Sequence, residues 1–264
     1  MQIWAVINLT PDSFFKNSRI NKRKFLTTAL NAIENGADVL DIGAESSRPF
    51  SRPLPWEEEW DRLKQPLAEL KSAIGENEFL KRVSVDTYKY ETAKNVLDLG
   101  AGFINDIRGG EDERILDLIK KYQRKIVIMH SKGTPENMQI NPQYKDVVKE
   151  VLDFLRARAK IAINLGIKKE NIILDYGIGF GKTVEQNIRL LKNTKLFKKE
   201  GFTLLAGVSR KSFIGKILNI ESAEERGFPS GILHTYLTIQ GIDILRVHDI
   251  KETAQIRSLL SLLK

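Results

Sequence analysis

Residues 171–191, NIILDYGIGFGKTVEQNIRLL, carry the signals of one strand, one loop and one helix in succession. The apolar run 171–176 is typical of a strand that is covered on both faces. Val184, Ile188 and Leu191 then recur with the period of a helix. Asp175 stands where the apolar run ends, and glycines follow at alternate positions 177, 179 and 181. The stretch predicts one βα unit with a polar residue at the end of its strand.

The segment GFGKT within this stretch looks like a loop that binds nucleotide phosphates, but its spacing excludes that function. Such a loop requires G-x-x-x-x-G-K-[ST]. Counting back from Lys182 places Tyr176 where the first glycine must stand. The aspartate and the glycines need another explanation.

The same alternation of short apolar runs and helix-period segments occurs eight times along the chain. The predicted strands are residues 3–9, 38–44, 82–87, 103–107, 125–130, 171–176, 203–209 and 243–249. Eight such units in 264 residues match a (β/α)8 TIM barrel of the α/β class, and an open doubly wound sheet is the alternative. Because no linker or internal repeat divides the chain, we expect a single domain over residues 1–264.

Local signals add detail to this outline. Pro66 should kink or divide the helix predicted around it. Gly36 and Gly100 stand where two helices should end. The long polar loops 10–21 (loop one) and 45–55 (loop two) are expected to be functional.

The composition is that of an ordinary globular protein, with 42% hydrophobic and 29% charged residues. The chain has no cysteine, which excludes disulfides and cysteine nucleophiles, and its three histidines are too scattered to suggest a zinc site. A net charge of +8 suits an anionic substrate, but no basic stripe is interleaved with aromatics, so we expect no nucleic-acid partner. No apolar run is long enough to cross a bilayer and no leader precedes the first strand, so we expect a cytoplasmic protein without a membrane partner.

Polar residues end nearly every predicted strand. They are Asn8, Asp41, Glu45, Asp86, Asn105, Asp106, His130, Asp175, Ser209, Arg210, Lys211, Arg246, His248 and Asp249. In a barrel these ends share the face that carries active sites. Any single residue could serve only the loop, and RVHD (246–249) could be a salt bridge between Arg246 and Asp249. Together they would be costly to desolvate unless they bind a polar ligand.

The residue types indicate which ligand they suit. Carboxylates and amides at separate points suit a flat heterocycle with several N–H donors and ring acceptors. Arg48, Lys211, Arg246 and His248 supply cations for an anion, and the planar fork of arginine suits phosphate oxygens. We therefore expect a flat polar ring joined to a phosphate group.

Eight stretches, in order along nearly the whole chain, resemble the dihydropteroate synthase family. They are INLTPDSF (7–14), GADVLDIGAESSRP (36–49), SVDTYK (84–89), INDIRGG (104–110), MHSKGTPENMQ (129–139), LDYGIGFGK (174–182), AGVSRKSFIGK (206–216) and RVHDI (246–250). The resemblance implies a transferase of folate biosynthesis on a TIM barrel. Such an enzyme joins p-aminobenzoate to 6-hydroxymethyl-7,8-dihydropterin pyrophosphate and releases 7,8-dihydropteroate and pyrophosphate, assisted by Mg²⁺.

The resemblance also implies a role for each matching residue. The pterin ring would be held by Asp86, Asn105, Asp175 and Lys211, in a slot lined by Met129, Phe180 and Gly207. Arg246 and His248 would bind the pyrophosphate, and Asn8 would reach the metal. Ser47, Arg48, Pro49 and Ser209 would lie toward the anion and the p-aminobenzoate. The family is a target of sulfonamides, which mimic p-aminobenzoate, and an isologous homodimer is the default oligomer.

These roles indicate a mechanism in which pyrophosphate leaves first. The carbocation-like centre that remains would be stabilised through the ring by Asp86 and Asp175, while Arg246, His248 and Mg²⁺ neutralise the leaving group. The aniline nitrogen of p-aminobenzoate is already unprotonated at neutral pH, so its attack needs no strong general base.

The chain departs from the family pattern mainly in its loops. Tyr176 replaces a proline, and Phe15, Lys16 and Asn17 replace the Ser-Asp-Gly that usually follows PDSF. Milder changes are Ala44 and Phe50 for glycines and Ser47 for threonine. They leave the predicted pterin pocket intact.

Two alternative functions remain open from the sequence. A methyltetrahydrofolate methyltransferase domain shares the barrel and the pterin pocket, but it does not need the cations of SRK (209–211) and of Arg246 and His248. A pterin-binding protein that has lost turnover through loop one would bind its ligand without releasing pyrophosphate. His130 and His234 stand apart from the cations and are expected to be structural.

Overall fold

Eight parallel strands form a closed barrel in which each strand pairs with its neighbours in the sequence and β1 pairs with β8. The computed structural model describes residues 1–9, 18–46, 51–133, 138 and 140–263, with the backbone alone for residues 18–23. The strands are β1 Gln2–Asn8, β2 Val39–Gly43, β3 Val83–Asp86, β4 Phe103–Asp106, β5 Lys125–Met129, β6 Ile172–Asp175, β7 Thr203–Ala206 and β8 Ile244–Val247. The TIM barrel predicted from the sequence is confirmed, and the open doubly wound sheet is wrong because the sheet closes.

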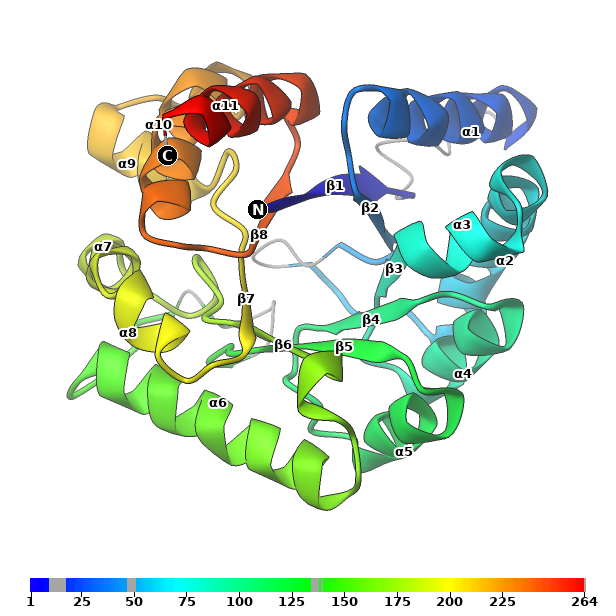
Figure 1. Ribbon diagram of the computed structural model, residues 1–264, viewed down its shortest axis with the longest axis horizontal. Coiled ribbons are helices and arrows are strands. Elements are labelled where there is room, and N and C mark those ends of the chain that lie inside the picture. Colours follow the sequence, from blue (N-terminus) through cyan, green and yellow to red (C-terminus); the bar gives the residue numbers. More distant parts are fainter. Residues whose placement is uncertain (10–17, 47–50, 134–137, 139, 264) are drawn as a thin grey trace.

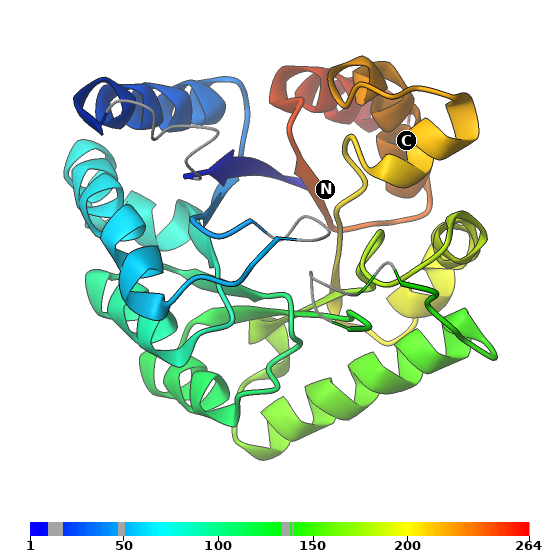
Figure 2. The same ribbon diagram turned by 180° about the vertical axis from the view of Figure 1, so that it is seen from behind.

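Helices surround the strands on all sides, as the two opposite views in Figures 1 and 2 show. The α-helices are α1 Ser18–Glu34, α2 Trp56–Ile74, α3 Glu76–Arg82, α4 Tyr90–Leu99, α5 Glu113–Tyr122, α6 Val147–Asn164, α7 Val184–Lys192, α8 Thr194–Lys198, α9 Ser212–Leu218, α10 Gly227–Ile239 and α11 Ile250–Leu262. Two short 3-10 helices are η2 Lys169–Asn171 and η3 Glu224–Arg226. None of the helices in the described part of the chain is long and apolar enough to cross a membrane.

The predicted helix ends are confirmed, and Pro66 lies inside a single helix. Gly100 caps α4 with φ of 105°, and Gly36 follows α1 with φ of 100°, both in the left-handed region that glycine adopts without strain. Pro66 does not divide α2, which runs through it. Pro66 lies on the buried face with Leu63 and Leu67, and burial of that face outweighs the helix hydrogen bond that proline cannot make.

Two layers of apolar side chains hold the barrel. The larger layer fills the space between sheet and helices and includes Leu40, Ile104 and Leu174. The second layer, which we call the inner plug, consists of Trp4, Val39, Phe103, Val127, Ile173, Leu205 and Ile244. The rings of Trp4 on β1 and Phe103 on β4 meet edge to face at 5.0 Å, so the inner plug lies inside the barrel.

Candidate active site

Strand geometry determines which side chains lie above the inner plug. Side chains two residues apart on a strand point to the same face, so the residues two positions beyond the plug also point into the barrel. On six strands these residues are Asp41, Asn105, Met129, Asp175, Gly207 and Arg246. They lie toward the carboxyl ends of the strands, where barrel enzymes carry their sites.

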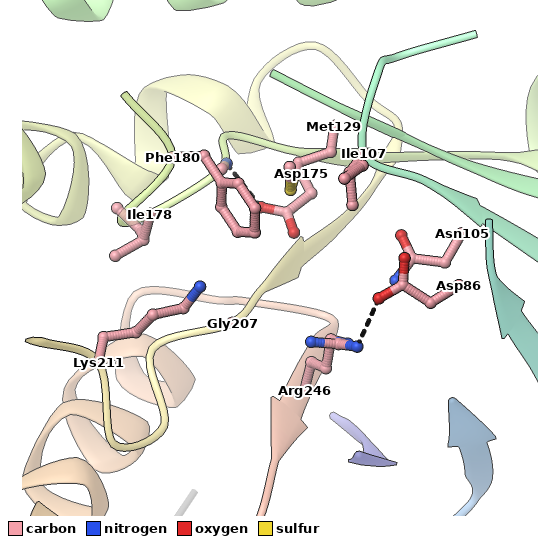
Figure 3. A pocket seen from close by; sticks show the side chains of 11 residues that line it. Asp86, Asn105, Ile107, Met129, Asp175, Ile178, Phe180, Gly207, Lys211 and Arg246 are labelled. Atoms are coloured by element: carbon pink, nitrogen blue, oxygen red, sulfur yellow. Dashed lines mark hydrogen bonds and ion pairs between the residues drawn. The ribbon is translucent and has the colours of Figure 1, made fainter. Parts of the chain in front are cut away.

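A cavity lies in this layer, with an empty volume of about 310 Å³ that includes the part open to solvent. Eight residues predicted for the site line it: Asp86, Asn105, Met129, Asp175, Phe180, Gly207, Lys211 and Arg246. Figure 3 shows the side chains of Asp175, Phe180 and Lys211 from one side and those of Asp86, Asn105 and Arg246 from the other, all bordering one space. The cavity is also lined by Ile107, Gly177 and Ile178, which the sequence analysis did not assign to it. The strand ends predicted to converge therefore do so.

Two carboxyl groups face the cavity with raised pKa values. Burial raises the pKa of Asp86 to about 7, although the nearby Arg246 guanidinium lowers it. Burial also raises the pKa of Asp175 to about 6, opposed by the N–H of Gly177, which donates to Asp175 Oδ1 at 2.7 Å. Raised carboxyl pKa values in a cavity are typical of functional sites.

Arg246 forms a fork beneath the cavity. Its Nε donates to Asp41 Oδ2 at 2.5 Å, and its Nη2 donates to Asp86 Oδ2 at 2.9 Å. Arg246 was predicted, together with His248, to bind the pyrophosphate. In the structure Arg246 lines the same cavity as the residues predicted to hold the pterin ring, because its interior position on β8 points into the barrel.

Lys211 crosses the loop after β6 before it reaches the cavity. Its Nζ lies 4.2 Å from the centre of the Phe180 ring, a distance at which a cation and an aromatic face attract. A Cβ on Gly179 would lie 3.2 Å from Lys211 Cδ, so the missing side chain leaves room for the lysine. Burial, together with Arg246, lowers the pKa of Lys211 to about 8.

The glycines after Asp175 are explained by a close approach of two loops. Gly177 has φ of 64°, and a Cβ there would lie 1.8 Å from the carbonyl oxygen of His130. Gly181 has φ of 65°, and its Cβ would lie 2.3 Å from the carbonyl oxygen of Lys132. No other residue fits at either position. The glycines thus bring the loop after β6 against the backbone after β5.

Lys182 holds this loop through hydrogen bonds to its backbone, a role that was not predicted from the sequence. Its Nζ donates to the carbonyl oxygens of Gly177 at 2.8 Å and Phe180 at 2.9 Å and lies 3.0 Å from His130 Nδ1. Burial lowers the pKa of Lys182 to about 7. His130 is itself buried and meets the ring of Phe154 edge to face, so it lies in the interior as expected.

Tyr176, which replaces the family's proline, points away from the cavity. Its side chain is fully buried and packs against the ring of Phe197 on α8, with ring centres 5.3 Å apart. Its hydroxyl lies 3.4 Å from Thr194 Oγ1. The extra ring therefore fills space between the sheet and α8 and leaves the cavity unchanged.

Of the residues predicted to bind the anion, Lys211 and Arg246 line the cavity and His248 does not. His248 is exposed, and its Nδ1 lies 3.1 Å from the hydroxyl oxygen of buried Ser209. Ser47, Arg48 and Pro49, like Phe15, Lys16 and Asn17, lie outside the described residues.

The salt bridge considered between Arg246 and Asp249 is wrong. Asp249 instead accepts from Arg210 Nε at 3.0 Å, while Arg246 turns inward to Asp41 and Asp86. Arg210 has φ of 58°, which is uncommon outside glycine. Its backbone N–H donates to Ser230 Oγ at 2.8 Å, so hydrogen bonds at both backbone and side chain hold the turn that separates Ser209 from Lys211.

A second buried group of charges lies beside the cavity, under loop two. Lys89 Nζ lies 2.6 Å from Glu45 Oε2 and 3.1 Å from Glu59 Oε2. Glu45 also accepts from the backbone N–H of Leu54 at 2.7 Å and from Tyr88 Oη at 2.7 Å. This group ties loop two to the segment after β3. From the sequence, Glu45 was predicted only to end a strand.

The residues present fit a magnesium ion that takes only one or two of its ligands from the protein. A Cβ on Gly43 would lie 3.8 Å from both Asn8 Oδ1 and Asp86 Oδ2, so both oxygens border the same space. In the described part of the chain, no group of three or more His, Cys, Asp and Glu side chains could hold a metal by itself. Magnesium commonly takes one or two protein oxygens together with phosphate oxygens and water, which fits this arrangement.

Comparison with known proteins agrees with this geometry. Residues 4–248 match the family described as pterin binding enzyme. Dihydropteroate synthase of Synechocystis sp. is 38% identical over 259 residues, which cover 96% of this chain and 87% of that protein. The structure of Xanthomonas albilineans dihydropteroate synthase with 4-aminobenzoic acid has a TM-score of 0.91 and 33% identity, covering 99% of this chain and 92% of that one. The same enzyme in complex with 7,8-dihydropteroate has a TM-score of 0.87 and 31% identity, covering 99% and 93%. The chain belongs to the pterin-binding enzymes and, among them, to the dihydropteroate synthase family.

Proposed function

We propose that this protein joins p-aminobenzoate to the methylene carbon of 6-hydroxymethyl-7,8-dihydropterin pyrophosphate, with the cavity above the inner plug as its pterin site. The observation that carries the proposal is the convergence of Asp86, Asn105, Asp175 and Lys211 on one cavity. Related structures hold 4-aminobenzoic acid and 7,8-dihydropteroate, a substrate and the product of this reaction.

The cavity presents hydrogen-bond acceptors that suit a ring with several N–H groups. Asp86 and Asp175 accept when ionised, and Asn105 can accept through its amide oxygen. Lys211 donates from the opposite side to a ring oxygen or nitrogen. Met129 and Phe180 supply apolar contacts to the faces of the ring.

The reaction breaks the bond between the methylene carbon and the pyrophosphate oxygen, and the electron pair leaves with pyrophosphate. The two carboxylates stabilise the positive charge that spreads into the ring. Arg246, which lines the cavity, would meet the departing oxygen, and the exposed His248 would contact the outer part of the pyrophosphate. The aniline nitrogen then forms the new bond to carbon and loses one proton to solvent.

Magnesium remains a proposal that rests on the oxygen atoms at the rim. Asn8 and the diphosphate oxygens would hold the ion, with Asp86 at the edge of the same space. A bound Mg²⁺ would supply charge neutralisation for the leaving group.

The p-aminobenzoate would lie over Phe180, toward loop two and Ser209. Sulfonamides should compete at this position, since they mimic p-aminobenzoate. Competition would appear as a raised KM for p-aminobenzoate with kcat unchanged.

The cytoplasmic location expected from the sequence stays a prediction.

We further propose that the protein forms a homodimer through α10 and α11. Apolar side chains are exposed on these neighbouring helices, among them Phe228 at 82%, Ile232 at 55% and Leu259 at 62%. Exposed apolar patches are typical of interfaces. Sedimentation of the native protein should give a dimer, and Phe228→Asp should give a monomer; a native monomer at micromolar concentration would contradict the interface.

Pyrophosphate release tests the proposed function directly. The native protein, given the dihydropterin pyrophosphate, p-aminobenzoate and Mg²⁺, should release pyrophosphate in step with dihydropteroate. Lys211→Ala and Asp175→Asn should lower kcat/KM by about 100-fold or more, as loss of preorganised charged groups does. The exposed Lys216→Ala and Asp117→Asn are matched controls and should retain activity.

The outcomes separate the alternatives. Binding of the dihydropterin pyrophosphate without pyrophosphate release would identify a pterin-binding protein that has lost turnover. Release that ignores p-aminobenzoate, or that survives Lys211→Ala and Asp175→Asn, would contradict the assignment.

A further inference from the structure

Asp41 is a buried carboxylate for which the reaction proposed above has no use. It lies on β2, two residues beyond Val39 of the inner plug, and its side chain is 0% exposed. It is not among the residues that line the cavity. A carboxylate removed from water to this extent is costly unless its oxygens are fully paired.

Three donors from three other strands converge on Asp41. Ser84 Oγ on β3 donates to Asp41 Oδ1 at 2.6 Å. Asn105 Nδ2 on β4 and Arg246 Nε on β8 both donate to Asp41 Oδ2, at 2.9 and 2.5 Å. Asn105 and Arg246 both line the cavity, so Asp41 is the shared partner beneath two residues of the pterin site.

The bond to Asp41 determines which group Asn105 offers to a ligand. An ionised carboxylate has no hydrogen to donate, so only the NH₂ end of the amide can face Asp41. The amide oxygen must then lie on the other side of the amide, available to the cavity that Asn105 lines. Asn105 therefore acts as an acceptor toward the ring and not as a donor.

Asp41 Oδ2 also fixes the plane of the Arg246 guanidinium. With Nε on Asp41 and Nη2 on Asp86, the planar group is held at two points on two strands. Its orientation thus depends on Asp41 as well as on Asp86. One buried carboxylate thereby aligns both an acceptor and a cation of the cavity.

We propose that Asp41 is a positioning residue that sets the hydrogen-bond polarity of the pterin site through Asn105 and Arg246. This inference rests on the proposed function, since it explains why the site presents acceptors to a ring rich in N–H groups. What Asp41 must supply is an acceptor at the position of Oδ2. Its negative charge is secondary, because Asp86 also pairs with Arg246.

Two substitutions of nearly the same shape separate an acceptor from a charge. In Asp41→Asn the amide oxygen can take the place of Oδ2 while the NH₂ donates to Ser84 Oγ, so the polarity survives. Asp41→Leu keeps the shape and removes the acceptor. Isothermal titration with 6-hydroxymethyl-7,8-dihydropterin pyrophosphate and Mg²⁺, without p-aminobenzoate, gives the Kd of each variant.

We expect Asp41→Asn to bind within about threefold of the native protein and Asp41→Leu to bind about tenfold or more weakly. In an Asn105→Ala background the loss of affinity caused by Asp41→Leu should be smaller, because the effects of two residues on Kd do not add when one acts through the other. Equal losses in Asp41→Asn and Asp41→Leu, or the same loss with and without Asn105, would overturn the proposal.

Controls address folding and specificity. Ser84→Ala removes the donor to Oδ1 alone and should bind within about threefold of the native protein, with thermal unfolding recorded for every variant. If Asp41→Leu does not fold, NMR of the native protein decides: the side-chain NH₂ of Asn105, assigned with Asn105→Ala, should exchange slowly with solvent with or without ligand. Fast exchange would contradict the bond to Asp41.

The test also distinguishes this inference from the proposed function. A native protein that does not bind the dihydropterin pyrophosphate contradicts the function itself. A native protein that binds and turns over, with variants that depart from the expected order, contradicts only the role of Asp41.

Discussion

Arg246 Nη2 lies 2.9 Å from Asp86 Oδ2, so a cation on β8 holds a carboxylate on β3 across the mouth of the barrel. Burial nevertheless raises the pKa of Asp86 to about 7, which shows that the guanidinium offsets only part of the desolvation. The pair therefore stands close to a change of protonation at neutral pH. Binding of a ring that donates N–H bonds should depend on that change.

We predict that kcat/KM falls on the acid side, because the carboxylates must be ionised to accept from the ring. With the pKa of Asp86 near 7 and that of Asp175 near 6, kcat/KM should drop by about tenfold per pH unit between about pH 7 and pH 6, and by about a hundredfold per unit below about pH 6, where both carboxylates become protonated. The measurement is a pH profile of initial rates with p-aminobenzoate saturating. Asp86→Asn should be weakly active, and its kcat/KM should no longer fall near pH 7. If kcat/KM of this variant still falls near pH 7, the ionisation belongs to another group.

Lys182 should make the protein more stable as the pH rises. Burial lowers its pKa to about 7 in the folded protein, below the value near 10.5 of the unfolded chain. Between these values the unfolded chain binds more protons, so the free energy of unfolding increases with pH. Compared with Lys182→Met, the native protein should gain stability from about pH 7 to about pH 9 in denaturant titrations. The exposed Lys216→Met should show no such change. If the free energy of unfolding of the native protein minus that of Lys182→Met falls as the pH rises, the lowered pKa of Lys182 is contradicted.

The fold and the position of the site could be predicted because both follow from patterns along the chain. Continuous apolar runs gave all eight strands, although the run 203–209 exceeds β7, which ends at Ala206 because the chain turns into its loop there. Polar residues at the carboxyl ends of parallel strands must share one face of a barrel, so Asp86, Asn105 and Asp175 could be grouped without coordinates.

Other parts of the site depend on contacts that sequence patterns do not specify. Lys182 contacts His130, which is 52 residues away in the sequence, and Arg246 contacts Asp41, which is 205 residues away. One signal for Asp41 was present, since it stands two residues beyond an apolar strand residue, as Asn105 and Arg246 do. The partner of each such residue depends on strand register and on which rotamer packs, and neither follows from spacing alone.

Tyr176 should contribute to stability and not to catalysis. Its ring is fully buried against Phe197, on the far side of the strand end from the cavity. Tyr176→Ala should lower the free energy of unfolding by about 3 kcal/mol or more, as removal of a buried aromatic ring does. Tyr176→Phe loses only the hydroxyl contact to Thr194 and should cost about 1 kcal/mol. Both variants should keep the native kcat at temperatures where they are folded; a large loss of kcat in Tyr176→Phe would place the hydroxyl in the reaction.

Lys89 should couple stability to the placement of loop two. It lies between Glu45 and Glu59, whose side chains are 8% and 1% exposed, so Lys89→Met would leave two buried carboxylates without their shared cation. Breaking a buried ion pair in this way costs about 3–5 kcal/mol, although protonation of Glu59, whose pKa burial already raises, would recover part of that.

The same change should act on substrate binding through the backbone. Glu45 accepts from the N–H of Leu54, so a Glu45 released from Lys89 loosens the end of loop two. We expect Lys89→Met to raise the KM for p-aminobenzoate more than that for the dihydropterin pyrophosphate, because the pterin cavity keeps its lining. Lys94→Met, which removes an exposed ion pair with Asp98, is the matched control and should change neither KM. Equal effects of Lys89→Met on both KM values would mean that Lys89 supports the barrel as a whole and not loop two.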